Sequence, residues 1–135
     1  MTLKVTRVNP DGLPVNPAFA QGVLVEQPQR LLFVGGQNAV TADGGIDGDD
    51  LATQTVRALR NVELVLLAAG GTLADVVSWT ILAVEGHPLQ EGFQAFRTVW
   101  SPAEPPAISV AVVAGLANPR FLVEISAVAA LGPAA

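Results

Sequence analysis

Residues 105–129 read PPAISVAVVAGLANPRFLVEISAVA and contain two alternating apolar runs, with one acidic residue, Glu124, inside the second run. Two prolines fix φ ahead of the first run, and glycine, asparagine and proline between the runs favour a turn. The pattern therefore predicts two paired strands, and the rest of the chain is interpreted around this pair.

Glu124 is the residue whose surroundings decide what this strand pair does. A side-chain period of two places Ile108 and Val110 on one face of the first strand, and Glu124 and Ser126 on one face of the second. A lone glutamate in a strand is commonly a solvated edge residue, because charged groups are rarely buried without a partner. The alternative is a carboxylate that faces apolar neighbours in a binding cleft.

The chain is strongly apolar for its size. It has 135 residues, of which 50% are hydrophobic and 14% are charged, and a mean hydropathy of +0.46. The length predicts one domain over residues 1–135. Apolar surface left after folding is expected to be covered by further copies, so we expect a homo-oligomer. No run reaches the roughly 18 apolar residues of a spanning helix, and the N-terminus lacks a signal-peptide pattern, which predicts a cytoplasmic protein without a membrane partner.

Residue counts exclude or disfavour several kinds of chemistry. There is no cysteine and no tyrosine, and His87 is the only histidine, so we expect no metal site and no Ser-His-Asp arrangement. Residues 41–50, TADGGIDGDD, are acidic, but their spacing does not match a calcium-binding EF-hand, and the last aspartate is expected to cap a helix. The formal net charge of −5 argues against a nucleic-acid partner.

Two helices are predicted from apolar spacing. Residues 50–69 have an apolar stripe with a period of 3.6, preceded by aspartates and followed by two glycines. Pro88 begins the second helix. Its stripe, which we interpret as core packing rather than as a cofactor site, consists of Leu89, Phe93, Phe96 and Trp100.

The order of elements predicts an α+β fold. Runs 22–26 and 30–35 are separated by Gln27, Pro28 and Gln29 and are expected to form a hairpin. Both helices are expected to pack on one face of a sheet, and another subunit's sheet is the candidate cover for the other face. Further strands are predicted at residues 3–8 and 76–84.

Segments spread over nearly the whole chain resemble the RidA/YjgF family, also called the L-PSP endoribonuclease family. In order, they are NPAFAQGVLV, LLFVGGQNAV, LATQTVRALRNVELVLLAAGGTLADVV, PPAISVAV and LVEISAVA. The resemblance implies a Bacillus chorismate mutase-like fold with a mixed sheet, three subunits whose sheets pack into a central barrel, and ligand clefts between neighbours. For members that are enzymes, it implies hydrolysis of reactive 2-imino or enamine acids to 2-keto acids and ammonia, without a cofactor.

The resemblance also assigns candidate site residues, several of which depart from the family pattern. Glu124 matches the glutamate associated with the attacking water and is the catalytic candidate. Ile108 stands where the family has the arginine that clamps the substrate carboxylate. The other candidate ligand-binding positions are Phe19 in place of a tyrosine, Gly35 in place of a serine, Gly36 at a family glycine, Phe93 in place of an asparagine, Val110 in place of a cysteine, and Ser126 beside Glu124.

Loss of the arginine separates two functional hypotheses. A hydrogen bond to a charged group contributes about 1.5 to 3 kcal/mol, and Glu124 would repel a carboxylate. We therefore expect a homotrimer that binds a small neutral or cationic metabolite, without typical 2-imino acid deaminase activity. The alternative is a cofactor-independent deaminase of imines or enamines with a relocated arginine, for which Arg30, Arg97 and Arg120 are equal candidates. A ribonuclease role is disfavoured by the acidic charge and the single histidine.

Overall fold

The structure is a computed structural model that describes residues 2–134. Each helix and strand predicted from the sequence is present. None of the helices in this range is both long and apolar enough to cross a membrane. In chain order the elements are β1 (Lys4–Val8), β2 (Gly22–Glu26), β3 (Arg30–Gln37), α1 (Leu51–Ala68), a 3-10 turn (Leu73–Asp75), β4 (Val76–Val84), α2 (Leu89–Val99), β5 (Ala107–Val113) and β6 (Val123–Leu131).

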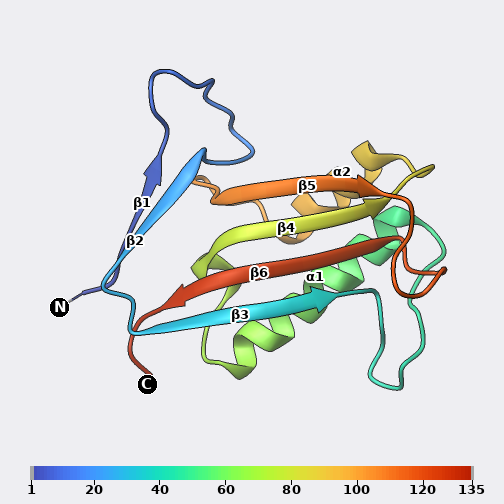
Figure 1. Cartoon of the computed structure of the whole chain (residues 1–135). Helices are drawn as coiled ribbons and strands as arrows, with labels where there is room; N and C mark the ends of the chain where they lie inside the picture. The colour runs from blue at the N-terminus through green and yellow to red at the C-terminus, as the bar shows by residue number, and fades with distance from the viewer. Residues whose placement is uncertain (1, 135) are drawn as a thin grey trace.

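The predicted α+β fold is confirmed. Four strands form one sheet in the order β3-β6-β4-β5, and β1 and β2 form a separate antiparallel pair. β6 runs antiparallel to β3 and β4, whereas β4 and β5 are parallel. Parallel strands need a crossover connection, and α2 supplies it. Figure 1 shows both helices behind the four-stranded sheet, so its front face carries no helix from residues 2–134.

The predicted pairing of the two runs in residues 105–129 is wrong. These runs form β5 and β6, which lie in the same sheet, but β4 separates them. Residues 114–122 connect the two strands past the end of β4, where the N–H of Val84 donates to the carbonyl of Leu122 at 2.9 Å. The turn-forming residues between the runs therefore belong to a longer loop and not to a hairpin.

The predicted hairpin of residues 22–26 and 30–35 is also wrong. β2 pairs with β1, and β3 pairs with β6. In the short connection between them Gln27 has a φ of 55°, and the N–H of Gln29 donates to the carbonyl of Leu131 at 3.2 Å. The connection thus separates two strands where the sequence indicates, but those strands lie in different sheets and do not pair with each other.

Helix α1 begins where the sequence predicts, after the last aspartate of the acidic loop. The Asp50 side chain accepts hydrogen bonds from the backbone N–H of Thr53 at 2.7 Å and from the Thr53 hydroxyl at 3.1 Å. These hydrogen bonds lower the pKa of Asp50, because they stabilise its charged form. Asp50 is thus the N-cap that fixes where the chain leaves the loop.

Alternate side chains divide the sheet into two faces. Trp79 and Ile81 on β4, and Ile125 and Ala127 on β6, are buried in the core together with apolar residues of α1. The positions between them point away from the helices, to a side that we call the open face. Its residues include Leu31, Phe33, Gly36, Ser78, Thr80, Leu82, Glu124, Ser126 and Val128.

The open face combines exposed apolar side chains with a polar region. Phe33 is 72% exposed and Leu31 is 51% exposed, both on β3. Thr80 and Ser126 lie opposite each other further along the sheet. Exposed apolar groups gathered on one side are typical of an association surface.

Candidate ligand pocket and open sheet face

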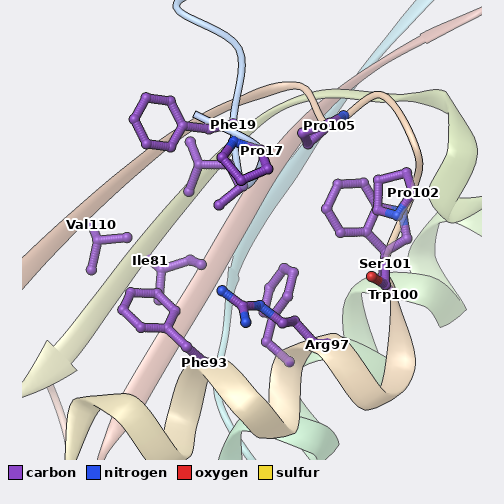
Figure 2. A pocket seen from close by; sticks show the side chains of 13 residues that line it. Pro17, Phe19, Ile81, Phe93, Arg97, Trp100, Ser101, Pro102, Pro105 and Val110 are labelled. Carbon is purple, nitrogen blue, oxygen red and sulfur yellow. The ribbon is translucent and has the colours of Figure 1, made fainter. Parts of the chain in front are cut away.

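A pocket of about 630 Å³ lies on the helix face, between the edge of the sheet formed by β4 and β5 and helix α2. Figure 2 shows how side chains from these elements and from two loops surround it. The volume falls within the roughly 300 to 1,000 Å³ typical of small-molecule sites. The lining residues are Pro17, Ala18, Phe19, Ile81, Phe93, Phe96, Arg97, Trp100, Ser101, Pro102, Pro105, Ile108 and Val110.

Three aromatic side chains support the wall of the pocket. Trp79 contacts both Phe96 and Trp100 edge-on, with ring centroids 5.4 Å apart in each pair, and Phe96 and Trp100 lie 5.8 Å apart. The indole N–H of Trp100 donates to the carbonyl of Leu73 at 3.2 Å. Each edge-to-face pair contributes about 0.5 to 1.5 kcal/mol beyond burial. The helical stripe predicted as core is therefore also a pocket wall, because Phe93, Phe96 and Trp100 all line the cavity.

Phe19 is held over the pocket by a tight turn. Asn16 and Phe19 form an isolated antiparallel bridge, and Oδ1 of Asn16 accepts a hydrogen bond from the N–H of Ala18 at 2.7 Å. The next residue, Ala20, is buried, and its N–H donates to the carbonyl of Pro106 at 2.9 Å. The turn is thus joined to the chain just before β5, which makes it part of the pocket.

Four of the predicted ligand-binding residues meet at this pocket. Phe19 comes from the turn, Phe93 from α2, and Ile108 and Val110 from β5. Ile108 is aligned with the buried Trp79 in the parallel pairing of β4 and β5. This register places Ile108 and Val110 on the helix face of the sheet.

The other predicted site residues lie on the open face. A β-carbon at Gly36 would lie 2.6 Å from Cδ and 2.7 Å from Oε2 of Glu124, so the missing side chain at Gly36 gives the glutamate its place. Ser126 lies two positions further along β6, opposite Thr80. Gly35 lies beside Gly36 in an irregular part of the β3–β6 pairing, and a β-carbon there would meet no atom within 4 Å.

Within one chain the sheet separates Glu124 from Ile108. Glu124 points to the open face, in register with Leu82, whereas Ile108 lines the pocket on the helix face. The expectation of a neutral or cationic ligand depends on a cleft that contains both residues, and no such cleft forms within residues 2–134 of one chain. The charged residue among those that line the pocket is Arg97.

Of the three arginines considered as replacements, Arg97 is the one at the pocket. Arg30 instead donates to two backbone carbonyl groups, at 2.7 and 3.0 Å, beyond the ends of α1 and β6. Arg120 does not line the cavity. Figure 2 shows the Arg97 side chain reaching from α2 into the space bordered by Phe93 and Trp100.

The sequence contains a signal for Arg97 that the aromatic stripe obscures. Phe93, Phe96, Arg97 and Trp100 follow the spacing i, i+3, i+4, i+7, which places all four on one side of a helix. A cation within such a stripe indicates that this side is not wholly core. Apart from Phe19 and Trp100, the lining residues outside helices and strands, where no period marks them, are Pro17, Ala18, Ser101, Pro102 and Pro105.

Possible metal ligands do not cluster within residues 2–134. Over residues 2–134, no group of three His, Asp or Glu side chains is arranged to hold a metal ion. Two aspartates of the acidic loop serve local structure: Asp50 caps the start of α1, and Asp43 accepts a hydrogen bond from the N–H of Gly45 at 3.0 Å.

Known proteins share this architecture. The chain matches the family model described as Endoribonuclease L-PSP over residues 14–131. It is similar to YyfB of Yersinia pestis, a Rid-family protein of unknown function, with 34% identity, coverage of 94% of this chain and 98% of that chain, and a TM-score of 0.82. It is also similar to Rv2704 of Mycobacterium tuberculosis, from the YjgF/YER057c/UK114 family, with 29% identity, 95% and 100% coverage and a TM-score of 0.66. It is similar as well to the yeast protein YEO7, with 25% identity, coverage of 94% of this chain and 98% of that chain, and a TM-score of 0.69.

Two helices packed on one face of a mixed sheet, with these neighbours, define a chorismate mutase-like α+β fold. The chain belongs to the RidA/YjgF family, whose family model is named after the L-PSP endoribonuclease. The resemblance seen in the sequence segments is therefore confirmed.

Proposed function

We propose that the protein is a homotrimer of the RidA/YjgF type that binds a small molecule in this pocket and lacks typical 2-imino acid deaminase activity. The observation that supports the proposal is Ile108, which lines the pocket at the position that the family resemblance assigns to the carboxylate-clamping arginine. Val110 and Phe19 line it as well, without the thiol and the hydroxyl that the resemblance assigns to their positions.

Isoleucine cannot replace the interactions of that arginine. Hydrogen bonds to a charged group contribute about 1.5 to 3 kcal/mol, and a bidentate guanidinium–carboxylate pair belongs to the stronger end. The loss corresponds to a factor of about 10 to 100 or more in affinity. A small imino acid such as 2-iminopropanoate has little apolar surface with which to compensate for it.

A homotrimer would bring the two separated groups of predicted site residues together. In one chain Glu124 lies on the open face and Ile108 on the helix face. Packing of further copies against the open face would cover Phe33 and Leu31, and it would allow Glu124 of one subunit to reach the pocket of another. Support comes from the exposed apolar side chains of this face and from the family resemblance, which implies clefts between neighbours.

The second candidate function is a retained imine or enamine deaminase with a relocated clamp. Arg97 favours it, because its guanidinium is at the pocket and could bind the substrate carboxylate. Glu124 of a neighbouring subunit would then take a proton from water as the water oxygen adds to the imine carbon. Glu124 would return that proton to the nitrogen, and the carbinolamine would then collapse as its hydroxyl proton also passes to the nitrogen, which releases ammonia and leaves the 2-keto acid.

Ammonia release from freshly generated 2-iminopropanoate separates the two functions. The proposal predicts that the wild-type protein releases ammonia no faster than buffer alone, while a family member that retains the arginine does so in the same assay. Turnover by the wild type that is abolished by Glu124→Ala and weakened by Arg97→Gln would replace the proposal with the second candidate.

A further inference from the structure

Three amide side chains donate hydrogen bonds to the backbone close to Gly36 and Glu124. We propose that Asn38, Gln54 and Asn61 are positioning residues, which fix the Glu124 carboxyl group beside Gly36 on the open face. The inference rests on the proposed function in taking Glu124 as the side chain that reaches a neighbouring subunit's pocket. It concerns the place of that side chain within its own chain, so neither the ammonia assay nor the subunit number decides it.

The pairing of β3 with β6 is interrupted where Gly36 meets Glu124. Between Val34 and Gln37, β3 has two residues where β6 has one, which is a β-bulge. Gly36 lies in this bulge, and a β-carbon there would lie 2.6 Å from Cδ of Glu124. A bulge disrupts the ladder of hydrogen bonds. At Glu124, β6 is therefore held by regular pairing with β4 but not by regular pairing with β3.

The Asn38 side chain supplies a link that the interrupted ladder lacks. Its Nδ2 donates to the carbonyl of Val123, the residue before Glu124, at 2.9 Å. Asn38 is in turn held from α1, because Nδ2 of the buried Asn61 donates to its carbonyl at 3.0 Å. The same Nδ2 donates to the carbonyl of Val40 at 2.9 Å. Hydrogen bonds thus connect α1, through the residue after β3, to the peptide group that precedes Glu124.

Gln54 holds the segment that leads into β6. Its Oε1 accepts a hydrogen bond from the N–H of Leu122 at 2.9 Å, and its Nε2 donates to the carbonyl of Arg120 at 3.0 Å. Nε2 also donates to the carbonyl of Gly48, in the acidic loop, at 3.0 Å. The Gln54 side chain is 1% exposed, so these backbone groups would lose their partner inside the protein if it were removed.

The residue types on α1 indicate a role beyond filling the core. Gln54 and Asn61 are seven positions apart, which places both on the side of the helix that is buried. Figure 1 shows α1 behind β6 and β3, the two strands that carry the contact. A buried amide costs free energy unless its polar atoms are hydrogen-bonded, whereas an apolar side chain fills the same space without that cost. The hydrogen bonds of these amides go mainly to segments 38–40 and 120–122, next to the two strands.

A fixed position matters for Glu124 because no cationic side chain of its own chain holds it. The salt bridge present in residues 2–134 joins Arg60 to Glu63 on α1. Glu124 is half-buried, and its side chain packs against Gly36. A group that acts at a site needs its supporting backbone and neighbours to be fixed, since a small displacement removes it from reach of a ligand. The amides provide this support from α1 and from the residue after β3.

The test follows the contact between Gly36 and Glu124 by NMR. In the wild-type protein we expect nuclear Overhauser effects (NOEs) between the γ protons of Glu124 and the α protons of Gly36. In Asn38→Ala these NOEs should be lost, because the carbonyl of Val123 loses its partner and the bulge is no longer tied to β6. Arg30→Ala is the matched control and should keep the NOEs, since Arg30 donates to backbone carbonyl groups at the other end of the same strand pair.

Gln54→Leu and Asn61→Leu should lose the same NOEs, because they keep an apolar volume and remove the donors. Leu59→Ala separates positioning from stability: Leu59 is fully buried on α1, so this variant should melt at a lower temperature while it keeps the NOEs. Circular dichroism shows which variants are folded. Asn38→Ala removes one hydrogen bond of a half-buried side chain, so it is expected to fold and decides the test if the leucine variants do not.

The proposal is overturned if the NOEs persist in any folded variant of the three amides. It is also overturned if Arg30→Ala or Leu59→Ala removes them, because the contact would then follow general stability. Absence of the NOEs from the wild-type protein would overturn it as well.

Discussion

The two faces of the four-stranded sheet differ in what covers them within residues 2–134. On the helix face, β4, β5, α2 and two loops enclose a pocket lined by Phe19, Arg97 and Ile108. On the open face, Glu124 and Gly36 are in close contact, and no helix of residues 2–134 covers them. The first face holds a pocket that is lined by residues of one chain, and the second face is not covered by a helix of residues 2–134.

This difference explains why the predicted site residues separate into two groups. Side chains alternate along β6, so Glu124 lies on the open face while the buried Ile125 next to it lies in the core. Residues of one sheet that face opposite sides can share a cleft only through a second copy of the chain. The comparison therefore predicts that substitutions on the open face change the assembly of the protein. Substitutions on the helix face should instead change the stability of the single chain.

The largest expected effect is loss of assembly on placing a charge on the open face. In Phe33→Glu, a side chain that is 72% exposed would bring a carboxylate into the proposed subunit contact, where its desolvation is not compensated. We expect light scattering after size exclusion to give the trimer mass for the wild type and the monomer mass for this variant.

Leu64→Glu is the control for that experiment. Leu64 is 59% exposed on α1, on the helix side of the molecule, so the same charge there should leave the mass unchanged. A Phe33→Glu protein that keeps its assembled mass would show that the open face is not the contact between copies.

The next effect concerns stability, and it compares two neighbouring residues of β6. Ile125 is fully buried, and Ile125→Ala should lower the free energy of unfolding by about 2 to 5 kcal/mol because it removes packed atoms and leaves a cavity. Ser126 lies on the open face, and Ser126→Ala should change the free energy of unfolding by about 0.5 kcal/mol or less. Urea unfolding of both variants measures the difference, and equal losses would remove the distinction between the two faces.

A third prediction tests the clamp position on the helix face. Ile108→Arg would place a guanidinium at the floor of the pocket, on the strand where the family resemblance expects it. We expect ammonia release from 2-iminopropanoate to rise at least tenfold above the wild-type level, from the hydrogen bonds that an ionised pair supplies. Ile108→Leu keeps the apolar volume and should stay at the wild-type level. A folded Ile108→Arg protein without any gain would argue that this position does not hold the carboxylate.

The sequence predicts the elements of this fold better than their neighbours in the sheet. The 3.6-residue stripe and Asp50 are local signals, and they locate α1 correctly because capping and helix periodicity depend on residues close in sequence. Strand pairing depends on distant residues, so the alternating pattern of β5 and β6 did not reveal that β4 lies between them. The order β4, α2, β5 is nevertheless typical of a parallel unit with a helical crossover, and that order was available from the sequence.

The candidate site shows the same limit. Phe19, Phe93, Ile108 and Val110 were indicated by the family resemblance and do meet at the pocket. The face on which each strand residue points follows from alternation, but which face holds the pocket follows from packing of α2, which sequence spacing does not give. For this reason the sequence did not indicate that Arg97, and not Glu124, lines the pocket.

The smallest expected effect concerns the contact between Gly36 and Glu124 on the open face. In Gly36→Ala the new methyl group would lie 2.6 Å from Cδ of Glu124, so the glutamate side chain must move. Because the atoms that clash belong to a flexible side chain, the glutamate can move at a cost of about 0.5 to 1.5 kcal/mol, which is the cost of a side-chain torsion held about 30° from its preferred angle. The lower chain entropy of the unfolded alanine variant offsets about 0.4 to 1 kcal/mol of this cost.

In Gly35→Ala the new methyl group meets no atom within 4 Å, so this variant is the matched control. We therefore expect both variants to melt close to the wild type, while the side-chain carboxyl ¹³C resonance of Glu124 shifts in Gly36→Ala alone. A shift of equal size in Gly35→Ala would mean that the strand as a whole, and not the space left by Gly36, positions the glutamate.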